Sequence, residues 1–164
     1  MTDALATVRR VRPDDWSALR GIRLEALADT PEAYGSTLAD VSTWPDERWR
    51  LMAGGRANFL AEVDGRVVGM VAGGTNNEWP GTRWMYAMYV TPETRGTGVA
   101  DDLVEMVSQW ARDEGVGQLY LSVTATVARA RAFYERMGFR LTGTTTSMSR
   151  DPGVTLVTMV RDLD

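Results

Sequence analysis

The sequence predicts an α/β domain built on a mixed, mostly antiparallel sheet that contains a central parallel strand-helix-strand crossover. Three observations predict it. Asp64-Gly65 separates two apolar runs, which is typical of a two-residue β-hairpin. The run from Arg83 to Val90 is nearly all apolar, as expected of a central strand buried on both faces. From Val99 the apolar period becomes that of a helix, and a further strand follows, an order that forms a right-handed crossover.

Length and composition indicate one folded domain. The chain has 164 residues, with 44% hydrophobic and 24% charged residues, so we expect a single domain over residues 1–164. No apolar run approaches the roughly 20 residues that a membrane helix needs. The N-terminal residues do not contain the apolar segment and cleavage site of a secretory signal peptide. We therefore expect a cytoplasmic protein that has no membrane partner.

The N-terminal half is expected to begin with a strand and a helix. The strand covers Thr7 to Val11, and Pro13 opens the helix with two acids in its first turn, where the helix dipole favours them. Apolar residues at helical spacing form the buried face of this helix, namely Trp16, Leu19, Ile22, Ala26 and Leu27. The remaining elements are a short helix over 46–52 and the two hairpin strands, Asn58 to Val63 and Arg66 to Gly73.

The C-terminal half holds two amphipathic helices and three strands. The long helix has apolar residues on one face, namely Val99, Leu103, Met106, Val107 and Trp110, and ends before Gly115. The short helix has an apolar face of Ala130, Phe133, Tyr134 and Met137, and it ends at Gly138. The expected strands are Leu119 to Val123, Phe139 to Gly143 and Val154 to Val160.

Three residue types are absent, and their absence restricts the chemistry. There is no Cys, no His and no Lys, and all 18 basic residues are Arg. This excludes a thiol nucleophile, a histidine base, a Schiff base and a Walker A phosphate loop. We expect no metal site. The net charge of -4 and the interspersed charges do not predict a nucleic-acid partner, whereas an acidic protein more readily attracts a cationic small molecule.

The junction between the central strand and the long helix has the composition of an anion site. In the segment Arg95-Gly-Thr-Gly-Val-Ala100, two glycines let the backbone approach a ligand, and the helix that follows presents free amides. The third glycine of a dinucleotide-binding turn is replaced by Asp101, which disfavours a nicotinamide-dependent oxidoreductase. Asp101 and Asp102 suit the helix dipole, but they would repel a phosphate if they turned inward.

Two motifs resemble those of the GNAT superfamily of N-acetyltransferases. Arg95-Gly-Thr-Gly-Val-Ala100 is similar to the (Gln/Arg)-x-x-Gly-x-(Gly/Ala) signature. Some thirty residues further on, the run from Ala130 to Phe139 is similar to the second motif, A-x-x-F-Y-x-x-x-G-F. The stretch from Arg23 to Ser36 resembles one branch of the family more loosely. The resemblance implies a GNAT-type sheet and an enzyme that transfers an acetyl group from acetyl-CoA directly to an amine.

The resemblance also implies roles for individual residues. Acetyl-CoA would lie between two splayed parallel strands, with its pantetheine arm along the first of them and its pyrophosphate on the glycine loop. The implied cofactor-binding residues are Met88, Tyr89, Val90, Arg95, Gly96, Thr97, Gly98, Val99 and Ala100. Tyr134 would protonate the departing thiolate. The alternative for Tyr134 is a core aromatic beside Phe133.

The chain departs from the family pattern at two places. Val127 stands where many members carry an Asn, which puts one polar contact to the cofactor in doubt. The central strand carries no carboxylate, so the general base is not assigned, and Glu78 and Asp40 are the candidates. Several Trp residues fall where the family binds its acceptor and offer a wall for an aromatic or cationic substrate, with packing as the alternative role: Trp44, Trp49, Trp79 and Trp84.

Other functions stay open at this point. A non-catalytic acyl-CoA-binding or regulatory module would use the same fold and the same loop. The acceptor is a small-molecule or peptide amine, and amino acids, polyamines, antibiotics, protein N-termini and lysine side chains are all compatible with the sequence. We expect a monomer or a homodimer.

Overall fold

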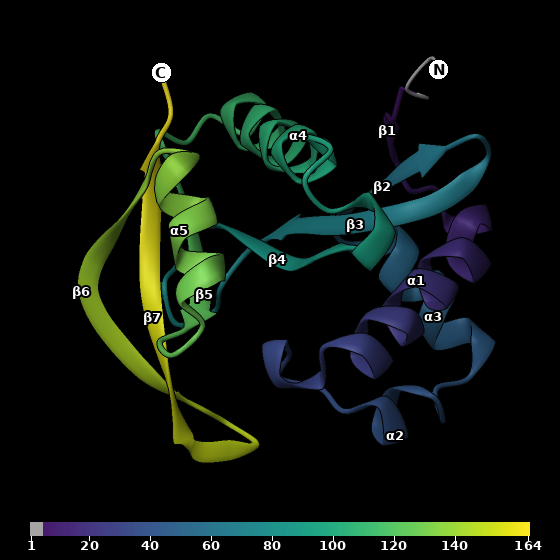
Figure 1. Cartoon of the computed structure of the whole chain (residues 1–164), viewed down its shortest axis with the longest axis horizontal. Helices are drawn as coiled ribbons and strands as arrows, with labels where there is room; N and C mark the ends of the chain where they lie inside the picture. The colour runs from purple at the N-terminus through teal and green to yellow at the C-terminus, as the bar shows by residue number, and fades with distance from the viewer. Residues whose placement is uncertain (1–4) are drawn as a thin grey trace.

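The computed structural model describes residues 5–164, which form one seven-stranded sheet with helices on both faces (Figure 1). The strand order is β1-β2-β3-β4-β5-β7-β6. The strands are β1 (Thr7–Arg10), β2 (Ala57–Val63), β3 (Arg66–Gly74), β4 (Arg83–Val90), β5 (Gln118–Thr124), β6 (Phe139–Met148) and β7 (Asp151–Asp162). Neighbouring strands are antiparallel except β4 and β5, which are parallel. The predicted fold class is confirmed.

The predicted helices are present, with shifted ends. They are α1 (Trp16–Asp29), α2 (Leu38–Val41), α3 (Asp46–Gly55), α4 (Val99–Asp113) and α5 (Ala128–Arg136). The turn that Pro13 opens is a short 3-10 helix (Pro13–Asp15), and the α-helix begins only after it. The α2 turn was not predicted, because its four residues are too few to show a period. None of the helices in residues 5–164 is long and apolar enough to cross a membrane.

Each face of the sheet has its own apolar core. On one face, α4 buries much of the stripe predicted from its period, including Val99, Leu103 and Val107, against the sheet residues Phe59 and Leu119. On the other face, α1 and α3 pack against β2, β3 and β4, with Leu19, Ile22 and Trp49 buried against Leu60 and Met70. The sheet is therefore fixed from both sides, and its middle strands are held in place.

Residues with positive φ form the turn between β2 and β3 and an irregularity in β6. Asp64 and Gly65 have φ of 51° and 78°, as a type I′ hairpin requires, so the predicted turn between β2 and β3 is confirmed. Gly143, which the sequence places at the end of a strand, has φ of 89° at an irregularity in β6. Pairing resumes after Gly143, so β6 and β7 are longer than predicted.

The parallel pairing of β4 with β5 is very short. Only two residue pairs join the strands, Arg83 with Leu119 and Trp84 with Tyr120. Further along β4, its register with β3 shifts, and Ala87 adopts a φ of 57°, which is uncommon for a residue other than Gly. Such a bulge bends a strand. The middle of β4 is consequently only partly buried, although the sequence predicts burial on both faces.

A glycine in β3 makes room for a tryptophan of α4, and this contact is testable. A Cβ on Gly73 would lie 2.4 Å from Cε3 of Trp110, whereas a Cβ on the adjacent Gly74 would meet Tyr86 at 3.4 Å. We expect Gly73→Ala to lower the free energy of unfolding by about 1–3 kcal/mol through overpacking. Gly74→Ala is the matched control, with an expected change within about 0.5 kcal/mol. Thermal and urea unfolding measure the stability of both variants. If Gly73→Ala were as stable as Gly74→Ala, the Trp110 ring would not be confined by Gly73.

Candidate functional site

The loop between β4 and α4 has free amides, as its sequence predicts. Gly96 and Gly98 have φ of 80° and 92°, and Gly98 is the N-cap of α4. The Thr97 hydroxyl donates to the carbonyl of Thr94 at 2.6 Å, which holds the loop closed. Within residues 5–164, the amides of Gly96, Thr97 and Gly98 donate no backbone hydrogen bond outside regular elements. These amides and the first turn of α4 form a positive terminus that is open to an anion.

An ion pair keeps one acid of this helix terminus away from the loop. The carboxylate of Asp101 accepts two hydrogen bonds from Arg136 of α5, at 3.0 and 3.1 Å. The pair joins the start of α4 to the end of α5. Asp102 is exposed. The repulsion of a phosphate by Asp101 is thereby reduced, because its charge is matched by a guanidinium.

The side chain of Arg95 binds protein rather than the free amides. Its Nη2 donates to Asp29 Oδ2 at 2.8 Å, and its Nε donates to the carbonyl of Val90 at 3.1 Å. The hydroxyl of Tyr89 donates to the same carboxylate oxygen at 3.3 Å. Burial, followed by the charges of Asp29 and Glu25, raises the pKa of Tyr89. Arg95 therefore connects the end of α1 to β4, and its contact with a pyrophosphate stays a prediction.

Backbone groups of β4 lie along the side that β5 leaves open. The amide of Thr91 donates to Val68 of β3, and Tyr89 is paired with Met70 of β3. Since successive residues of a strand direct their hydrogen-bonding groups to opposite sides, those of Met88 and Val90 face away from β3. Both predicted positions are thus on the open edge, whereas Tyr89, also predicted, has its backbone toward β3 and its side chain in the core.

Tyr134 has the free hydroxyl that its predicted role requires. Its ring packs edge-on against Phe139, with centroids 5.7 Å apart, and beside Phe133 at 5.2 Å. Among residues 5–164, no group forms a hydrogen bond with its hydroxyl. Burial raises the pKa of Tyr134, and the nearby Tyr34 adds to the effect. The packing explains how the ring is held, and the unpaired hydroxyl is available to a ligand.

Tyr34 is a site residue that the sequence reasoning missed. It is buried, and its hydroxyl donates to the carbonyl of Met88 at 2.9 Å. Burial raises the pKa of Tyr34 to about 12. Arg150, in the turn between β6 and β7, donates to the carbonyl of Tyr34 through Nε and Nη2, at 3.1 and 2.9 Å. The tip of this hairpin therefore reaches the connection after α1 (Figure 1). The available signal was an aromatic residue in a loop with Pro31 and Gly35.

The other predicted residues lie apart from these contacts. Glu78 and Asp40 are exposed, and neither forms an ion pair within residues 5–164. Of the four tryptophans, Trp49 is buried beneath α1 and Trp84 stacks on Tyr120 at 5.4 Å, so both have packing roles. Trp79 is 39% exposed, and Trp44 is partly buried under Arg48. Val127 is the N-cap of α5 and makes no side-chain capping bond.

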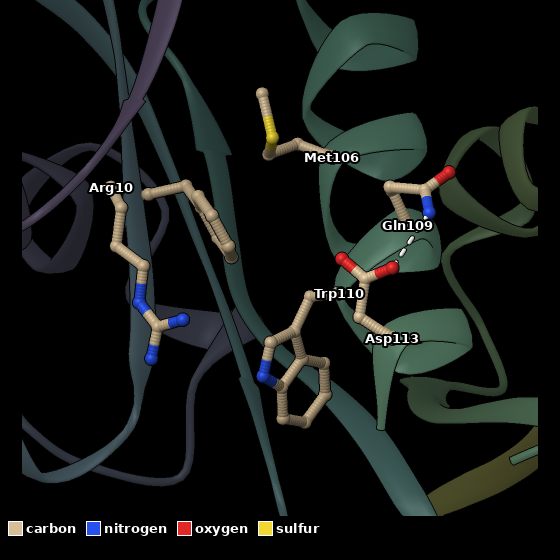
Figure 2. Close-up of a pocket in the computed structure, with 6 residues that line it drawn as sticks. Arg10, Met106, Gln109, Trp110 and Asp113 are labelled. Carbon is tan, nitrogen blue, oxygen red and sulfur yellow. Dashed lines mark hydrogen bonds between the residues drawn. The ribbon is translucent and has the colours of Figure 1, made fainter. Parts of the chain in front are cut away.

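A hollow of about 130 Å³ lies between β1 and α4 and shares no residue with the predicted site. Figure 2 shows Arg10 on one side and the α4 side chains on the other, with Gln109 donating to Asp113 at 3.0 Å. The lining residues are Arg10, Phe59, Met106, Gln109, Trp110 and Asp113. This set has no arrangement of acid, base and nucleophile that would suit catalysis.

Comparison with known proteins gives the same assignment as the motifs. Residues 19–139 match the model of the acetyltransferase (GNAT) family. The chain is 34% identical over 110 residues to the uncharacterized N-acetyltransferase YjgM of Escherichia coli (strain K12), a match covering 64% of this chain and 63% of that protein. It is 32% identical over 154 residues to the mycothiol acetyltransferase of Acidothermus cellulolyticus, covering 84% of this chain and 45% of that protein. It is 36% identical over 88 residues to N-acetyltransferase family 8 member 2 of Rattus norvegicus, covering 52% and 39%. The chain thus spans about half the length of these relatives.

Solved structures share the fold. A GNAT-family acetyltransferase from Streptococcus pneumoniae aligns with a TM-score of 0.78 at 16% identity, over 98% of this chain and 100% of that one. A GCN5-related N-acetyltransferase from Kribbella flavida aligns with a TM-score of 0.74 at 26% identity, over 96% and 98%. The family model covers most of the chain, and the split strands and glycine loop lie within the matched residues. The chain therefore belongs to the GNAT acetyltransferase family.

Proposed function

We propose that this protein transfers an acetyl group from acetyl-CoA directly to the nitrogen of an amine. The observation that carries the proposal is the open edge of β4, whose outward backbone groups at Met88 and Val90 lead to the free amides of the glycine loop. An acetyltransferase from Salmonella typhimurium, yncA, was solved with its cofactor acetyl-CoA, and it shares this fold with a TM-score of 0.77 at 20% identity.

The residues of the site suit an extended ligand that ends in a diphosphate. Backbone groups of Met88 and Val90 pair with the amides of a pantetheine arm as a neighbouring strand would. Each of their carbonyls already accepts one side-chain hydrogen bond, and a carbonyl can accept a second. The amides from Gly96 to Ala100 bind the pyrophosphate, aided by the dipole of α4.

Tyr134 supplies the proton that the reaction requires. The amine nitrogen attacks the acetyl carbonyl carbon, so that a C–N bond forms and the C–S bond breaks. The sulfur leaves as a thiolate and takes the proton of the Tyr134 hydroxyl, and the proton lost by the amine restores the phenol through solvent. Because its pKa is raised, Tyr134 stays protonated at neutral pH, and burial raises the pKa of a leaving thiol in the same direction. No Cys is present to form an acyl-enzyme, so transfer is direct.

Two observations favour a second candidate, a non-catalytic acyl-CoA-binding module. Val127 replaces the Asn that resemblance to the family predicts, and Glu78 and Asp40 are both exposed rather than placed as a buried base. A neutral amine needs no strong base, however, and water can accept its proton. Dependence of turnover on Tyr134 separates the two candidates.

Binding of acetyl-CoA is the first test, with two glycines as a matched pair. A ligand at 100 times its Kd adds about 2.7 kcal/mol of stability, so we expect acetyl-CoA to raise Tm by several degrees, and NAD and ATP to leave it unchanged. Gly98→Val is expected to abolish the effect of acetyl-CoA, because a β-branched side chain blocks the approach to the amides.

Gly115→Val is the control, since Gly115 also has a positive φ, of 81°, and lies in open space at the other end of α4. The Gly115→Val substitution introduces similar backbone strain, but acetyl-CoA is expected to raise the Tm of this variant as much as that of the wild type. Calorimetry gives the Kd values, and circular dichroism checks the fold. An unmoved Tm for the wild type would contradict the proposed cofactor, and equal losses in both variants would attribute the effect to strain.

Removal of one hydroxyl tests the proton donor. Tyr134→Phe keeps the ring contacts and is expected to lower kcat by roughly 10²- to 10⁴-fold, the usual contribution of general acid catalysis, with little change in acetyl-CoA affinity. Acyl donors with more acidic leaving thiols should recover part of the loss. Tyr120→Phe removes a hydroxyl bonded to Gln118 on β5 and serves as the control. Thiol release measures each rate, and a Tyr134→Phe enzyme as fast as the wild type would leave Tyr134 as a core residue.

A further inference from the structure

Two arginines on the α1–α3 side of the sheet have no acidic partner. Within residues 5–164, the ion pairs include neither Arg23 nor Arg56. The Nε and Nη1 atoms of Arg23 are buried and have no hydrogen-bond partner. The side chain of Arg56 donates one hydrogen bond, from Nε to Asn58 Oδ1 at 3.2 Å. Buried guanidinium donors without an acceptor are costly, so their retention points to an acceptor supplied from outside the chain.

Both guanidinium groups are partly removed from water. Burial lowers the pKa of Arg23, and burial together with the charge of Arg23 lowers the pKa of Arg56. A bound anion would offset the cost of removing these positive charges from water. The carboxylates of α1 do not neutralise these arginines, because Asp29 is paired with Arg95 and Glu25 is exposed.

The arginines adjoin the part of β4 where the acetyl group is to be transferred. The Cζ of Arg23 lies 4.9 Å from the ring centre of Tyr34, whose hydroxyl is bonded to the carbonyl of Met88. Arg56 donates to Asn58, which is in register with Ala72 of β3, and Ala72 is in turn in register with Tyr86, two residues before Met88 on β4. The bulge at Ala87 lies between Tyr86 and Met88. The pair therefore adjoins the open edge of β4, on the side of the sheet that α4 does not cover.

The surrounding contacts hold both side chains in place. Asn58 is buried, and its Nδ2 donates to the carbonyl of Met52 at 2.8 Å, which orients the Oδ1 that accepts from Arg56. Tyr34, beneath Arg23, is held by its own bond to Met88 and by Arg150. Guanidinium groups that are fixed before binding lose little entropy when they bind a planar anion.

We propose that Arg23 and Arg56 bind the carboxylate of the acceptor, and that the substrates are amines carrying such a group, namely free amino acids. The inference rests on the proposed acetyl transfer and narrows its substrate class. A guanidinium group matches a carboxylate through two parallel hydrogen bonds. The local charge also disfavours polyamines, although the net charge of -4 would attract them.

The test compares acids with their amides. With saturating acetyl-CoA, thiol release is measured for a panel of L-amino acids, for the same residues as primary amides, and for spermidine. We expect kcat/KM for the best amino acid to exceed that of its amide by roughly 10- to 100-fold, the usual effect of a hydrogen-bonded charge. The amine of an amide is less basic and hence more often neutral, so amine reactivity alone would give the opposite order.

Variants attribute the preference to the two arginines. Arg23→Gln and Arg56→Gln are each expected to bring the acid-to-amide ratio of kcat/KM toward one while leaving the Kd of acetyl-CoA unchanged. Arg140→Gln is the control, because Arg140 is an exposed residue of β6, the edge strand far from α1. Calorimetric binding of the N-acetyl amino acids and their amides, in the presence of CoA, gives the same ratio without turnover.

The outcomes separate this inference from the proposed function. A wild type that binds acetyl-CoA but favours amides or spermidine, or treats acids and amides alike, overturns the inference alone, and this comparison needs no variant to fold. A preference for acids that survives both substitutions also overturns it. A wild type that does not bind acetyl-CoA overturns the proposed function, and the inference with it.

Discussion

The arrangement of this protein depends on the early end of pairing between β4 and β5. Two residue pairs join the strands, and beyond Trp84 the edge of β4 is left without a partner. An unpaired strand edge inside a sheet would normally be costly, because its amides and carbonyls need partners. Here the bulge at Ala87 sets the course of the strand, and the open edge ends at the glycine loop. The backbone itself thus provides a linear binding surface.

The elements around this edge come from distant parts of the chain, and each provides one side of the site. The connection after α1 places Tyr34 on the carbonyl of Met88, and α5 packs Tyr134 against Phe139 of β6. The turn between β6 and β7 contacts the Tyr34 loop through Arg150. Tyr34 lies in the core on the α1 side, whereas Met88 and Tyr134 pack against the core on the α4 side, so the two apolar cores that hold the sheet also determine the geometry of the site.

Charge is distributed unevenly around the edge. At the glycine-loop end, ion pairs neutralise the acids that would oppose an anion, Asp101 through Arg136 and Asp29 through Arg95. At the other end, Arg23 and Arg56 have no such partners. Both ends are consequently receptive to negative charge, although the protein as a whole is acidic. The local field at a site, rather than net charge, decides which ligand is favoured.

The sequence by itself determined the features that depend on neighbouring residues. The hairpin at Asp64-Gly65, the free amides of the glycine loop and the buried stripe of α4 follow from local conformation and periodicity, and the absence of Cys, His and Lys limits the chemistry. Only the tertiary structure decided where β4 leaves β5, since Ala87 is not a residue type that favours a positive φ. It also paired Arg95 with Asp29 and brought Tyr34 to the carbonyl of Met88. These contacts join residues more than thirty positions apart, and such contacts are fixed by the packing of whole elements, which leaves no period or motif in the chain.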